Sequence, residues 1–442
     1  MKYRRVILFS FIIGIYILVF SDGCSKKEIV SPSRTIIIGI DGVGWNVLNP
    51  LLERECLPTF QHLKKTGSYG VLKTIKPTKS SIIWTSIATG KSMIKHGIVD
   101  WTFVSKNNIK LPYSRSERRV KTFWNIFGEF GYKVGVINWF ITYPPEKVSG
   151  YMVSEAFKQI YSPNFKDENV VYPRILQKKL IPFKKTTKDY KKILKQTCLP
   201  DFMHKAKNSR KGSLIRVYNI FVVQEKIIED ISFFLFFNWP TDIYATYFRL
   251  VDIVSHFATG LIDPNLLNKA KKEKEEKGVV TTETINQIDK ALALILEPVL
   301  SYYDRILNRF LSSMNENDNI IIISDHSFVF ENGGYGHTNM KNTPHGIILM
   351  KGPLVKKNFF IKDAHIYDIL PTLLYLYDLP VAKDMDGKVL IEALDKKLTS
   401  KRKIRWIESY ESDIQVESIK RRRNEKLDQK ILEELRSLGY IK

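Results

Sequence analysis

Cysteine is scarce in this sequence, with 3 residues among 442. Cys24 lies at the end of an apolar N-terminal segment, so only Cys56 and Cys198 remain in the body of the chain. Two cysteines so far apart in the sequence do not establish a disulfide, even in a compartment that permits one. The chain is long enough to bury a large core, as one α/β domain with insertions or as several smaller domains. We favour one domain with insertions.

Acidic residues are also in the minority, since 46 Asp and Glu stand against 69 Lys and Arg, and the formal charge is +23. Such a charge can indicate binding to nucleic acid or to an anionic membrane surface. However, the basic residues are spread through the chain, and no DNA- or RNA-binding motif accompanies them. We therefore expect no specific nucleic-acid binding, and we interpret the charge as a surface that favours anionic substrates or lipid head groups.

Residues 1–24 form a predicted targeting segment that lies outside the fold. Basic residues precede an apolar run from Val6 to Phe20, which is typical of an export signal. The small residue before Cys24 and the polar residues after it resemble a bacterial lipoprotein cleavage site, with Cys24 as the lipid-bearing residue. The alternative is an uncleaved signal anchor. In both cases we expect the body to lie outside the cytoplasm, periplasmic or on the cell surface, and tethered to a membrane.

Apolar β-branched runs alternate with helical segments along the body of the chain. The runs 35–40, 132–138 and 320–323 are predicted to be buried strands, and 241–249 has the alternation of another strand. Strands separated by helices predict an α/β fold with a mostly parallel central sheet and helices on both faces.

The alternation also predicts the domain boundaries. We expect a linker at 25–33, a main domain at 34–395 and a basic tail at 396–442 that contains a helix. From about 150 to 235 the alternation fails, and no acidic residue follows a strand there. This stretch is predicted to be an inserted cap over the site, where substrate preference would reside.

Acidic and histidine side chains follow two of the predicted strands. Asp41 comes directly after the strand at 35–40, and Asp325 and His326 stand together at the end of the later strand. In open α/β sheets, sites form beyond the carboxyl ends of the strands. These residues are therefore candidate metal ligands.

A second set of candidate ligands follows the strand at 241–249. Asp252 and His256 are four residues apart, a spacing that places both on one face of a helical turn. Such a pair is more often an ordinary hydrogen-bonded pair than a metal site. His337 in a glycine-rich loop adds another imidazole, with His345 as its competitor. Three carboxylates and three imidazoles suit two Zn²⁺ ions, with Mn²⁺ as a borderline alternative, and two ions about 4 Å apart can assist in-line phosphoryl displacement.

Ser80 stands at the start of a predicted helix that ends at Gly90. A hydroxyl at a helix N-terminus lies close to backbone N–H groups and to the positive end of the helix dipole, which favour an alkoxide and a bound phosphate. Ser80 is therefore a candidate nucleophile. The alternative is that Ser80 is only the N-cap of the helix, a position where serine is common.

Several motifs, in this order and spacing, resemble the type I phosphodiesterase/nucleotide pyrophosphatase family of the alkaline phosphatase superfamily. They are Ile38-Gly39-Ile40-Asp41-Gly42, the run from Ser80 to Gly90 with His96-Gly97-Ile98, Tyr247-Phe248-Arg249 with Asp252 and His256, Ser324-Asp325-His326, and Gly352-Pro353. The run from Tyr367 to Leu374, Met385-Asp386-Gly387 and the closing run from Leu435 to Tyr440 are similar to related bacterial members. The resemblance covers roughly residues 34 to 392, apart from the middle insertion.

The resemblance implies an alkaline phosphatase-like three-layer α/β sandwich and a catalytic domain at 34–395. By position, it implies that one zinc ion is held by Asp41, Ser80, Asp325 and His326, and the other by Asp252, His256 and His337. Ser80 would be the nucleophile that forms a phospho-enzyme intermediate, although Ser81 stands beside it. Ser327 replaces the glycine that usually follows the Asp-His pair, a local change that leaves the ligands intact.

The expected function is metal-dependent hydrolysis of a phosphodiester or phosphomonoester. Two alternatives remain, namely an envelope phospho-group transferase of the same superfamily and a surface lipoprotein that binds a ligand without catalysis. Sulfatases share the fold but need a Cys- or Ser-x-Pro-x-Arg motif, which the residues after Ser80 do not form. A phosphoglycerate mutase of the superfamily would be cytoplasmic, which contradicts the predicted export signal.

Overall fold

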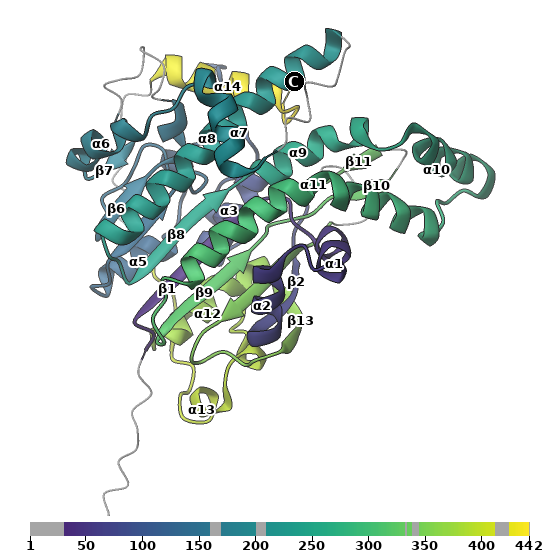
Figure 1. Ribbon diagram of the computed structural model, residues 1–442. Coiled ribbons are helices and arrows are strands. Elements are labelled where there is room, and N and C mark those ends of the chain that lie inside the picture. The colour runs from purple at the N-terminus through teal and green to yellow at the C-terminus, as the bar shows by residue number, and fades with distance from the viewer. Residues whose placement is uncertain are drawn as a thin grey trace, which may run out of the picture. The chain divides into compact units, whose positions relative to one another are not determined.

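The structure is a computed structural model of the 442-residue chain, shown in Figure 1. It describes residues 31–159, 169–199, 209–331, 334–337, 344–411 and 424–441. The targeting segment predicted at residues 1–24 and most of the linker at 25–33 lie outside the described residues. Among the helices that the structure describes, none combines the length and the apolar character needed to cross a membrane.

A mixed sheet runs through the described chain, and it is parallel at its centre. The strand order is β13-β2-β12-β9-β1-β8-β5-β6-β7. Five of the eight neighbouring pairs are parallel, including the four consecutive pairs from β9 to β6. The strands are β1 (Arg34–Ile40), β2 (Ser68–Lys73), β5 (Val134–Ile137), β6 (Gly150–Val153), β7 (Val171–Tyr172), β8 (Ile243–Phe248), β9 (Asp318–Ile323), β12 (Gly346–Lys351) and β13 (Phe359–His365). The predicted α/β fold with a mostly parallel sheet is confirmed.

Helices cover both faces of this sheet (Figure 1). Contacts join α1, α2, α9 and α11 to one another on one side, and α3 to α12 on the other. The helices are α1 (Trp45–Glu53), α2 (Pro58–Thr66), α3 (Ser80–Thr89), α4 (Met93–His96), α5 (Phe123–Glu129), α6 (Arg174–Leu180), α7 (Tyr190–Thr197), α8 (Ser209–Asn238), α9 (Leu250–Ala258), α10 (Pro264–Lys277), α11 (Thr282–Leu311), α12 (Ile369–Leu376), α13 (Lys396–Thr399) and α14 (Glu425–Ser437). Short hairpins are β3 (Thr102–Val104) with β4 (Lys110–Pro112) and β10 (Val329–Glu331) with β11 (Gly334–Gly336), and β14 (Val381–Ala382) pairs with β15 (Trp406–Ile407).

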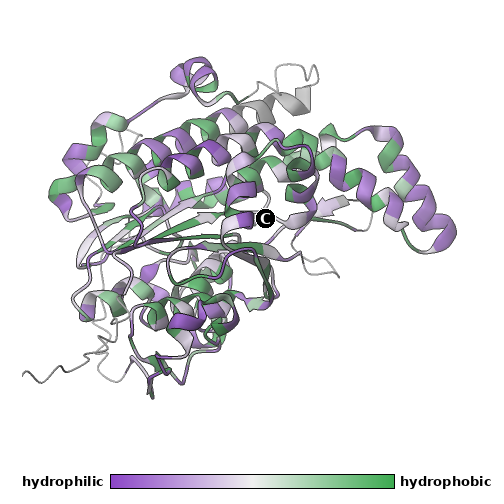
Figure 2. Ribbon diagram, turned by 60° about the horizontal axis from the view of Figure 1, so that its bottom comes forward, coloured by the Kyte–Doolittle hydropathy of each residue, from purple (hydrophilic) through white to green (hydrophobic). Residues whose placement is uncertain are grey.

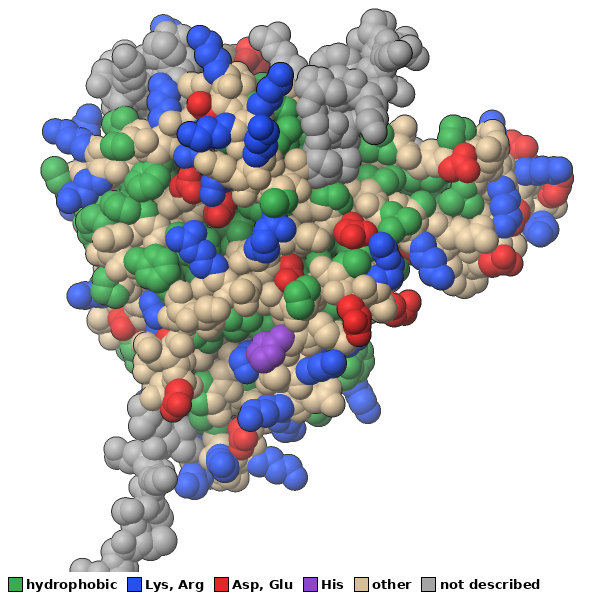
Figure 3. All heavy atoms as spheres, in the orientation of Figure 1, with side chains coloured by type: hydrophobic (Ala, Val, Ile, Leu, Met, Phe, Trp, Pro, Cys, Tyr) green, Lys and Arg blue, Asp and Glu red, His purple; other side chains and the backbone are tan. Residues whose placement is uncertain are grey.

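Charged residues lie on the outside of these layers. Figure 2 shows hydrophilic residues along the projecting helix α10, in which Ala270 is the one buried residue. On the face shown in Figure 3, Lys and Arg side chains are dispersed among Asp and Glu. This distribution agrees with the interpretation of the positive charge as a general surface property.

The cap predicted at about 150–235 differs from the structure. Its first part contains β6 and β7, which extend the central sheet beyond β5. Its last part is α8, where the Ser232 hydroxyl lies 2.9 Å from that of Thr246 in β8, and Tyr244 donates a hydrogen bond to the Ser232 carbonyl. The stretch is therefore built into the main fold. Strands of two to four residues are too short for a hydrophobic period to reveal them.

Close contact between β1 and α3 sets the position of Ser80 relative to the sheet. Ile36, Ile38 and Ile40 belong to the core on the α11 side, so Gly39 faces the opposite layer. There the Trp84 ring of α3 occupies the space where a side chain at position 39 would begin. The ring is held edge-on against Trp139 and Tyr247, at centroid distances of 5.0 and 4.9 Å.

We expect Gly39→Ala to destabilise the protein and to displace α3. The new Cβ would lie 2.6 Å from the Trp84 ring. Because Trp139 and Tyr247 pack against this ring, it cannot move aside easily, and the overpacking should cost about 1–3 kcal/mol of stability. Urea unfolding measures the loss. Gly260→Ala is the matched control, because no heavy atom lies within 4 Å of a Cβ at that position. Equal unfolding midpoints for the two variants would contradict this account of the β1–α3 contact.

Candidate metal centre

Two neighbouring parallel strands deliver the first candidate ligands. Gly39 of β1 is in register with Ile323 of β9, so the residues two positions further on, Asp41 and Asp325, leave the sheet side by side. His326 follows directly, and all three side chains are buried, with at most 2% of the side chain exposed. The Ser324 hydroxyl fixes this corner, because it accepts a hydrogen bond from the Val43 N–H and donates one to the His326 carbonyl.

These residues form one cluster with Ser80. The Nε2 atom of His326 lies 3.2 Å from Oδ1 of Asp41 and 3.5 Å from Oδ2 of Asp325. The Ser80 hydroxyl lies 3.4 Å from the same Nε2 atom. One ligand atom from each of Asp41, Asp325 and His326 falls within 4.8 Å of the others, which is compact enough for a shared cation.

The second cluster comes from α9 and the loop after β9. Asp252 and His256 lie on one face of α9, with 3.4 Å between Oδ1 and Nε2. The Nε2 atom of His337 lies 3.2 Å from that of His256 and 3.7 Å from Oδ1 of Asp252. The helical turn predicted for Asp252 and His256 is therefore present, and His337 is brought to the same place.

The two clusters adjoin at His326, whose ring stacks on that of His337 at a centroid distance of 4.0 Å. His326 Nε2 is also 3.9 Å from Oδ1 of Asp252. The predicted division of the ligands into two separate sets is therefore less sharp in the structure, because His326 lies close to residues of both sets. All seven predicted residues nevertheless converge on one region beyond the strand ends.

Both buried imidazoles turn Nε2 toward the centre. Nδ1 of His326 lies 3.1 Å from the Ser327 carbonyl, and Nδ1 of His337 lies 3.1 Å from the Thr78 carbonyl. Because a carbonyl can only accept, Nδ1 carries a proton in each case, and Nε2 is the nitrogen available to a metal ion. This is the tautomer that a metal-ligating histidine requires.

The carboxylates at this site lack the hydrogen bonds that buried carboxylates normally have. No donor in the described residues reaches Oδ1 of Asp41, Oδ1 of Asp252 or either oxygen of Asp325. Burial and the adjacent Asp41 carboxylate raise the pKa of Asp325 well above its usual value. Burial would lower the pKa of His326, but the neighbouring carboxylates raise it to about 10. Unpaired buried carboxylates beside acceptor imidazoles are a donor set that fits divalent cations.

Ser80 differs in one respect from its prediction. It is the first residue of α3 and not the N-cap, which is Lys79, and its hydroxyl makes no capping hydrogen bond. The neighbouring Ser81 hydroxyl donates to the Asp100 carbonyl at 3.1 Å. The geometry therefore favours Ser80 over Ser81 as the residue that faces the metal cluster.

His345 has a structural contact, as was expected by default. Its Nδ1 atom accepts a hydrogen bond from the Thr74 N–H at 3.2 Å. His345 belongs to neither of the two ligand groups that the described residues form.

Two tyrosines at the site were not predicted as site residues. Tyr247 of β8 donates a hydrogen bond to Oδ2 of Asp41, and Tyr440 donates one to Oδ2 of Asp252. Alternation along β8 places Tyr247 on the Gly39 side, so this residue was within reach of sequence analysis. Tyr440 was not, because it reaches the site from a segment almost two hundred positions away from Asp252.

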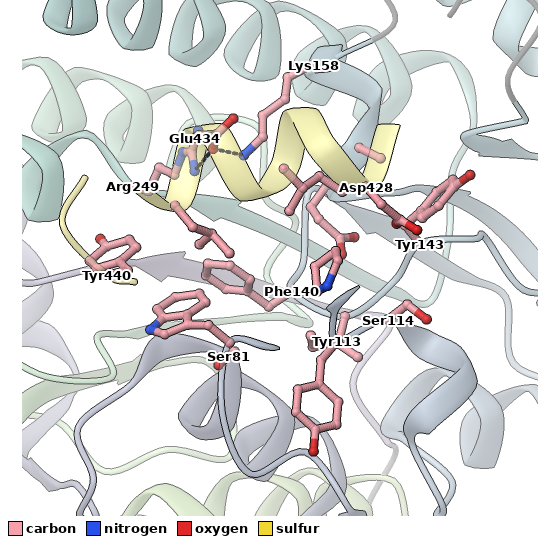
Figure 4. Close-up of a pocket in the computed structure, with 17 residues that line it drawn as sticks. Ser81, Tyr113, Ser114, Phe140, Tyr143, Lys158, Arg249, Asp428, Glu434 and Tyr440 are labelled. Carbon is pink, nitrogen blue, oxygen red and sulfur yellow. Dashed lines mark ion pairs between the residues drawn. The ribbon is translucent and has the colours of Figure 1, made fainter. Parts of the chain in front are cut away.

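A small cavity of about 60 Å³ opens beside the centre (Figure 4). Aromatic side chains form much of its wall, and Ser81 lies at its edge next to the candidate nucleophile. The residues that α14 and the following turn contribute are Asp428, Ile431, Glu434, Leu435 and Tyr440. The cavity is therefore a candidate pocket for the part of a substrate that adjoins the reacting group.

Comparison with solved structures finds similar chains, of which the first described here supports this fold. BT4656, solved in complex with its substrate D-glucosamine-2-N,6-O-disulfate, has a TM-score of 0.50 and 13% identity, and the match covers 83% of this chain and 81% of that one. Murine ectonucleotide pyrophosphatase/phosphodiesterase 5, solved as an inactive variant in complex with AMP, has a TM-score of 0.46 and 13% identity, with coverage of 82% and 100%. Phosphonate monoester hydrolase from Silicibacter pomeroyi has a TM-score of 0.44 and 12% identity, with coverage of 81% and 76%.

Sequence comparison identifies the family. No curated protein matches the sequence at a significant level. The family model described as type I phosphodiesterase/nucleotide pyrophosphatase matches residues 35–359, which include all seven candidate site residues. The chain belongs to the type I phosphodiesterase/nucleotide pyrophosphatase family and is a phosphoester hydrolase.

Proposed function

We propose that this protein hydrolyses phosphoric diesters or monoesters through Ser80 and two divalent cations. The observation that carries the proposal is the convergence of three buried carboxylates and three imidazoles next to the Ser80 hydroxyl. Mixed carboxylate and imidazole ligands suit Zn²⁺ best, with Mn²⁺ as the alternative.

The ligands divide between the two cations according to the two clusters. One set comprises Asp41, Ser80, Asp325 and His326, and the other comprises Asp252, His256 and His337. Support for this division comes from the short distances within each set. His326 lies between the sets, which keeps the two sites close enough to act on one phosphoryl group.

Ser80 supplies the attacking oxygen. Its position at the first turn of α3 places the backbone N–H groups and the positive end of the helix dipole beside the reacting phosphate. Bound cations would supply positive charge that stabilises the attacking oxygen and the leaving oxygen. The Ser80 oxygen bonds to phosphorus while the ester oxygen leaves as an alcohol, which takes up the serine proton. Water then attacks the phosphoserine: its oxygen bonds to phosphorus while the bond between phosphorus and the Ser80 oxygen breaks, one water proton passes to the Ser80 oxygen, and the phosphate product leaves.

We expect the described domain, purified with its native metal, to contain two equivalents of zinc and to hydrolyse bis-p-nitrophenyl phosphate or p-nitrophenyl phosphate. Treatment with a chelator should lower turnover at least about 100-fold, because the charge that stabilises the transition state is removed. Elemental analysis measures the metal, and absorbance of released nitrophenol measures turnover. Re-addition of Zn²⁺ and, separately, of Mn²⁺ distinguishes the two cations.

Stoichiometric metal with no turnover of any phosphate, phosphonate or sulfate ester would overturn the hydrolase proposal. Turnover that survives complete removal of metal would overturn the role of the cations. Magnesium added to the chelated protein is the matched control, since Mg²⁺ prefers oxygen ligands and should restore little activity.

A further inference from the structure

The two carboxylates that receive a tyrosine hydrogen bond are arranged alike. In Asp41 and in Asp252, Oδ2 accepts the tyrosine hydroxyl, whereas Oδ1 has no donor in the described residues. In each case Oδ1 is also the oxygen nearest to a cluster imidazole, at 3.2 Å for Asp41 and 3.4 Å for Asp252. A hydrogen bond to one oxygen thus holds the carboxylate so that its other oxygen faces the centre.

The two tyrosines differ in how they reach the site. Tyr247 lies in the middle of the sheet, in a strand paired on both sides. Tyr440 comes from the segment formed by α14 and its following turn, Glu425–Tyr440, which lies over the centre. Gly439 has a φ of +76°, a conformation that favours glycine, and the turn is closed by a hydrogen bond from the Tyr440 N–H to the Leu435 carbonyl.

Contacts with two other rings hold the Tyr440 ring. It stacks on Trp101, at a centroid distance of 4.7 Å and an interplanar angle of 8°. Its ring also meets the His256 ring at 5.2 Å in an edge-on arrangement. These contacts leave the hydroxyl directed at Asp252, so the ring is placed before any ligand binds.

An ion network ties α14 to the start of α9, the helix that carries Asp252. Glu434 of α14 lies 2.7 Å from the Arg249 guanidinium and 3.2 Å from the Lys158 ammonium (Figure 4). At most 15% of each of these three side chains is exposed. Arg249 directly precedes α9, so the helix that leads into the Tyr440 turn is fixed to the start of the helix that supplies Asp252. The ion pair between α14 and Arg249 therefore helps to set the distance between Tyr440 and Asp252.

We propose that Tyr440 is a positioning residue of the metal centre, which holds Asp252 in the orientation that binds the second cation. This inference rests on the proposed function, since it assumes that Asp252 is a metal ligand. Tyr440 itself binds neither metal nor substrate in this account. Tyr440 holds Oδ2 of Asp252 by a hydrogen bond, and this orients Oδ1 of the same carboxylate toward the cation.

The test compares Tyr440→Phe with the wild type and with Tyr375→Phe. The first change removes the hydroxyl but keeps the ring and its stack on Trp101. Tyr375 of α12 is the matched control, because its buried hydroxyl donates to the Arg402 carbonyl at 2.7 Å away from the candidate ligands. All three proteins are titrated with Zn²⁺ against a chelating dye, and the visible absorption of their Co²⁺-substituted forms is recorded.

We expect Tyr440→Phe to bind the second equivalent of zinc about 10- to 100-fold more weakly, with the first equivalent unchanged. Its cobalt spectrum should change, because the orientation of one ligand is no longer fixed. Turnover should fall at limiting zinc and recover in excess zinc, whereas Tyr375→Phe should match the wild type in every measurement. Recovery by excess metal is a result that a merely structural role would not produce.

A zinc affinity and a cobalt spectrum identical to those of the wild type would overturn the role of Tyr440. That result would leave the proposed function standing, provided that the wild type binds two equivalents of metal. A wild type that binds no metal would overturn both proposals. Equal weakening in Tyr440→Phe and Tyr375→Phe would also overturn the inference, since it would indicate general destabilisation.

Discussion

Ser80→Ala should lower kcat at least about 1,000-fold, because the reaction loses its nucleophile and the adjacent Ser81 hydroxyl is engaged with the Asp100 carbonyl. The folded structure should change little. The one hydrogen-bond contact of the Ser80 hydroxyl in the described residues is with Nε2 of His326, at 3.4 Å. Steady-state kinetics with bis-p-nitrophenyl phosphate measures the loss, and elemental analysis measures how much zinc the variant retains.

Ser81→Ala is the matched control, since it removes an adjacent buried hydroxyl from the same helix. That hydroxyl donates to the Asp100 carbonyl, so its loss should cost about 1 kcal/mol of stability and leave kcat within a few-fold of the wild type. Acid quenching during turnover, followed by peptide mass spectrometry, should find phosphate on Ser80. Phosphate on Ser81, or full activity of Ser80→Ala, would contradict the assignment of Ser80 as the nucleophile.

The sequence predicted the ligands that lie at strand ends, for a physical reason. Buried parallel strands are apolar throughout, so an acid directly after such a run is conspicuous, as Asp41 and Asp325 are. Parallel register then brings residues at equal distances beyond the strands together. The four-residue spacing of Asp252 and His256 needed only one helical turn, and α9 provides it.

Other parts of the site depend on contacts that no local pattern encodes. Tyr440 reaches Asp252 only because α14 docks on Arg249 and Lys158, and a pairing over such a distance has no sequence period. The stacking of His337 on His326 likewise joins two side chains that no local pattern brings together. The predicted start of α3 was one residue off. Ser80 was expected at the N-cap, where serine is common, but it is the first residue of the helix.

Asp325→Asn should make the metal-free protein more stable while it abolishes metal-dependent turnover. Both Asp325 oxygens are buried without a donor, and the Asp41 carboxylate is adjacent, so the metal-free site confines negative charge that water would otherwise solvate. An amide of the same shape removes one charge and can donate to a neighbouring carboxylate. We expect a gain of about 1–3 kcal/mol in the free energy of unfolding in the presence of a chelator. We also expect at least about a 100-fold loss of turnover with zinc present.

Asp318→Asn, at the other end of β9, is the control, and it should change the free energy of unfolding in the opposite direction. Asp318 is also buried, but it lies 3.0 Å from the Arg34 guanidinium, so the substitution leaves a cation without its partner and should lower stability. Urea unfolding of both variants, with chelator and with zinc, separates the two effects. If Asp325→Asn were less stable than the wild type without metal, the site would not be strained by its own charge. A fold tolerates unpaired buried charge where that charge binds a cation. Without such strain, the missing hydrogen-bond donors at these carboxylates would no longer indicate a cation-binding site.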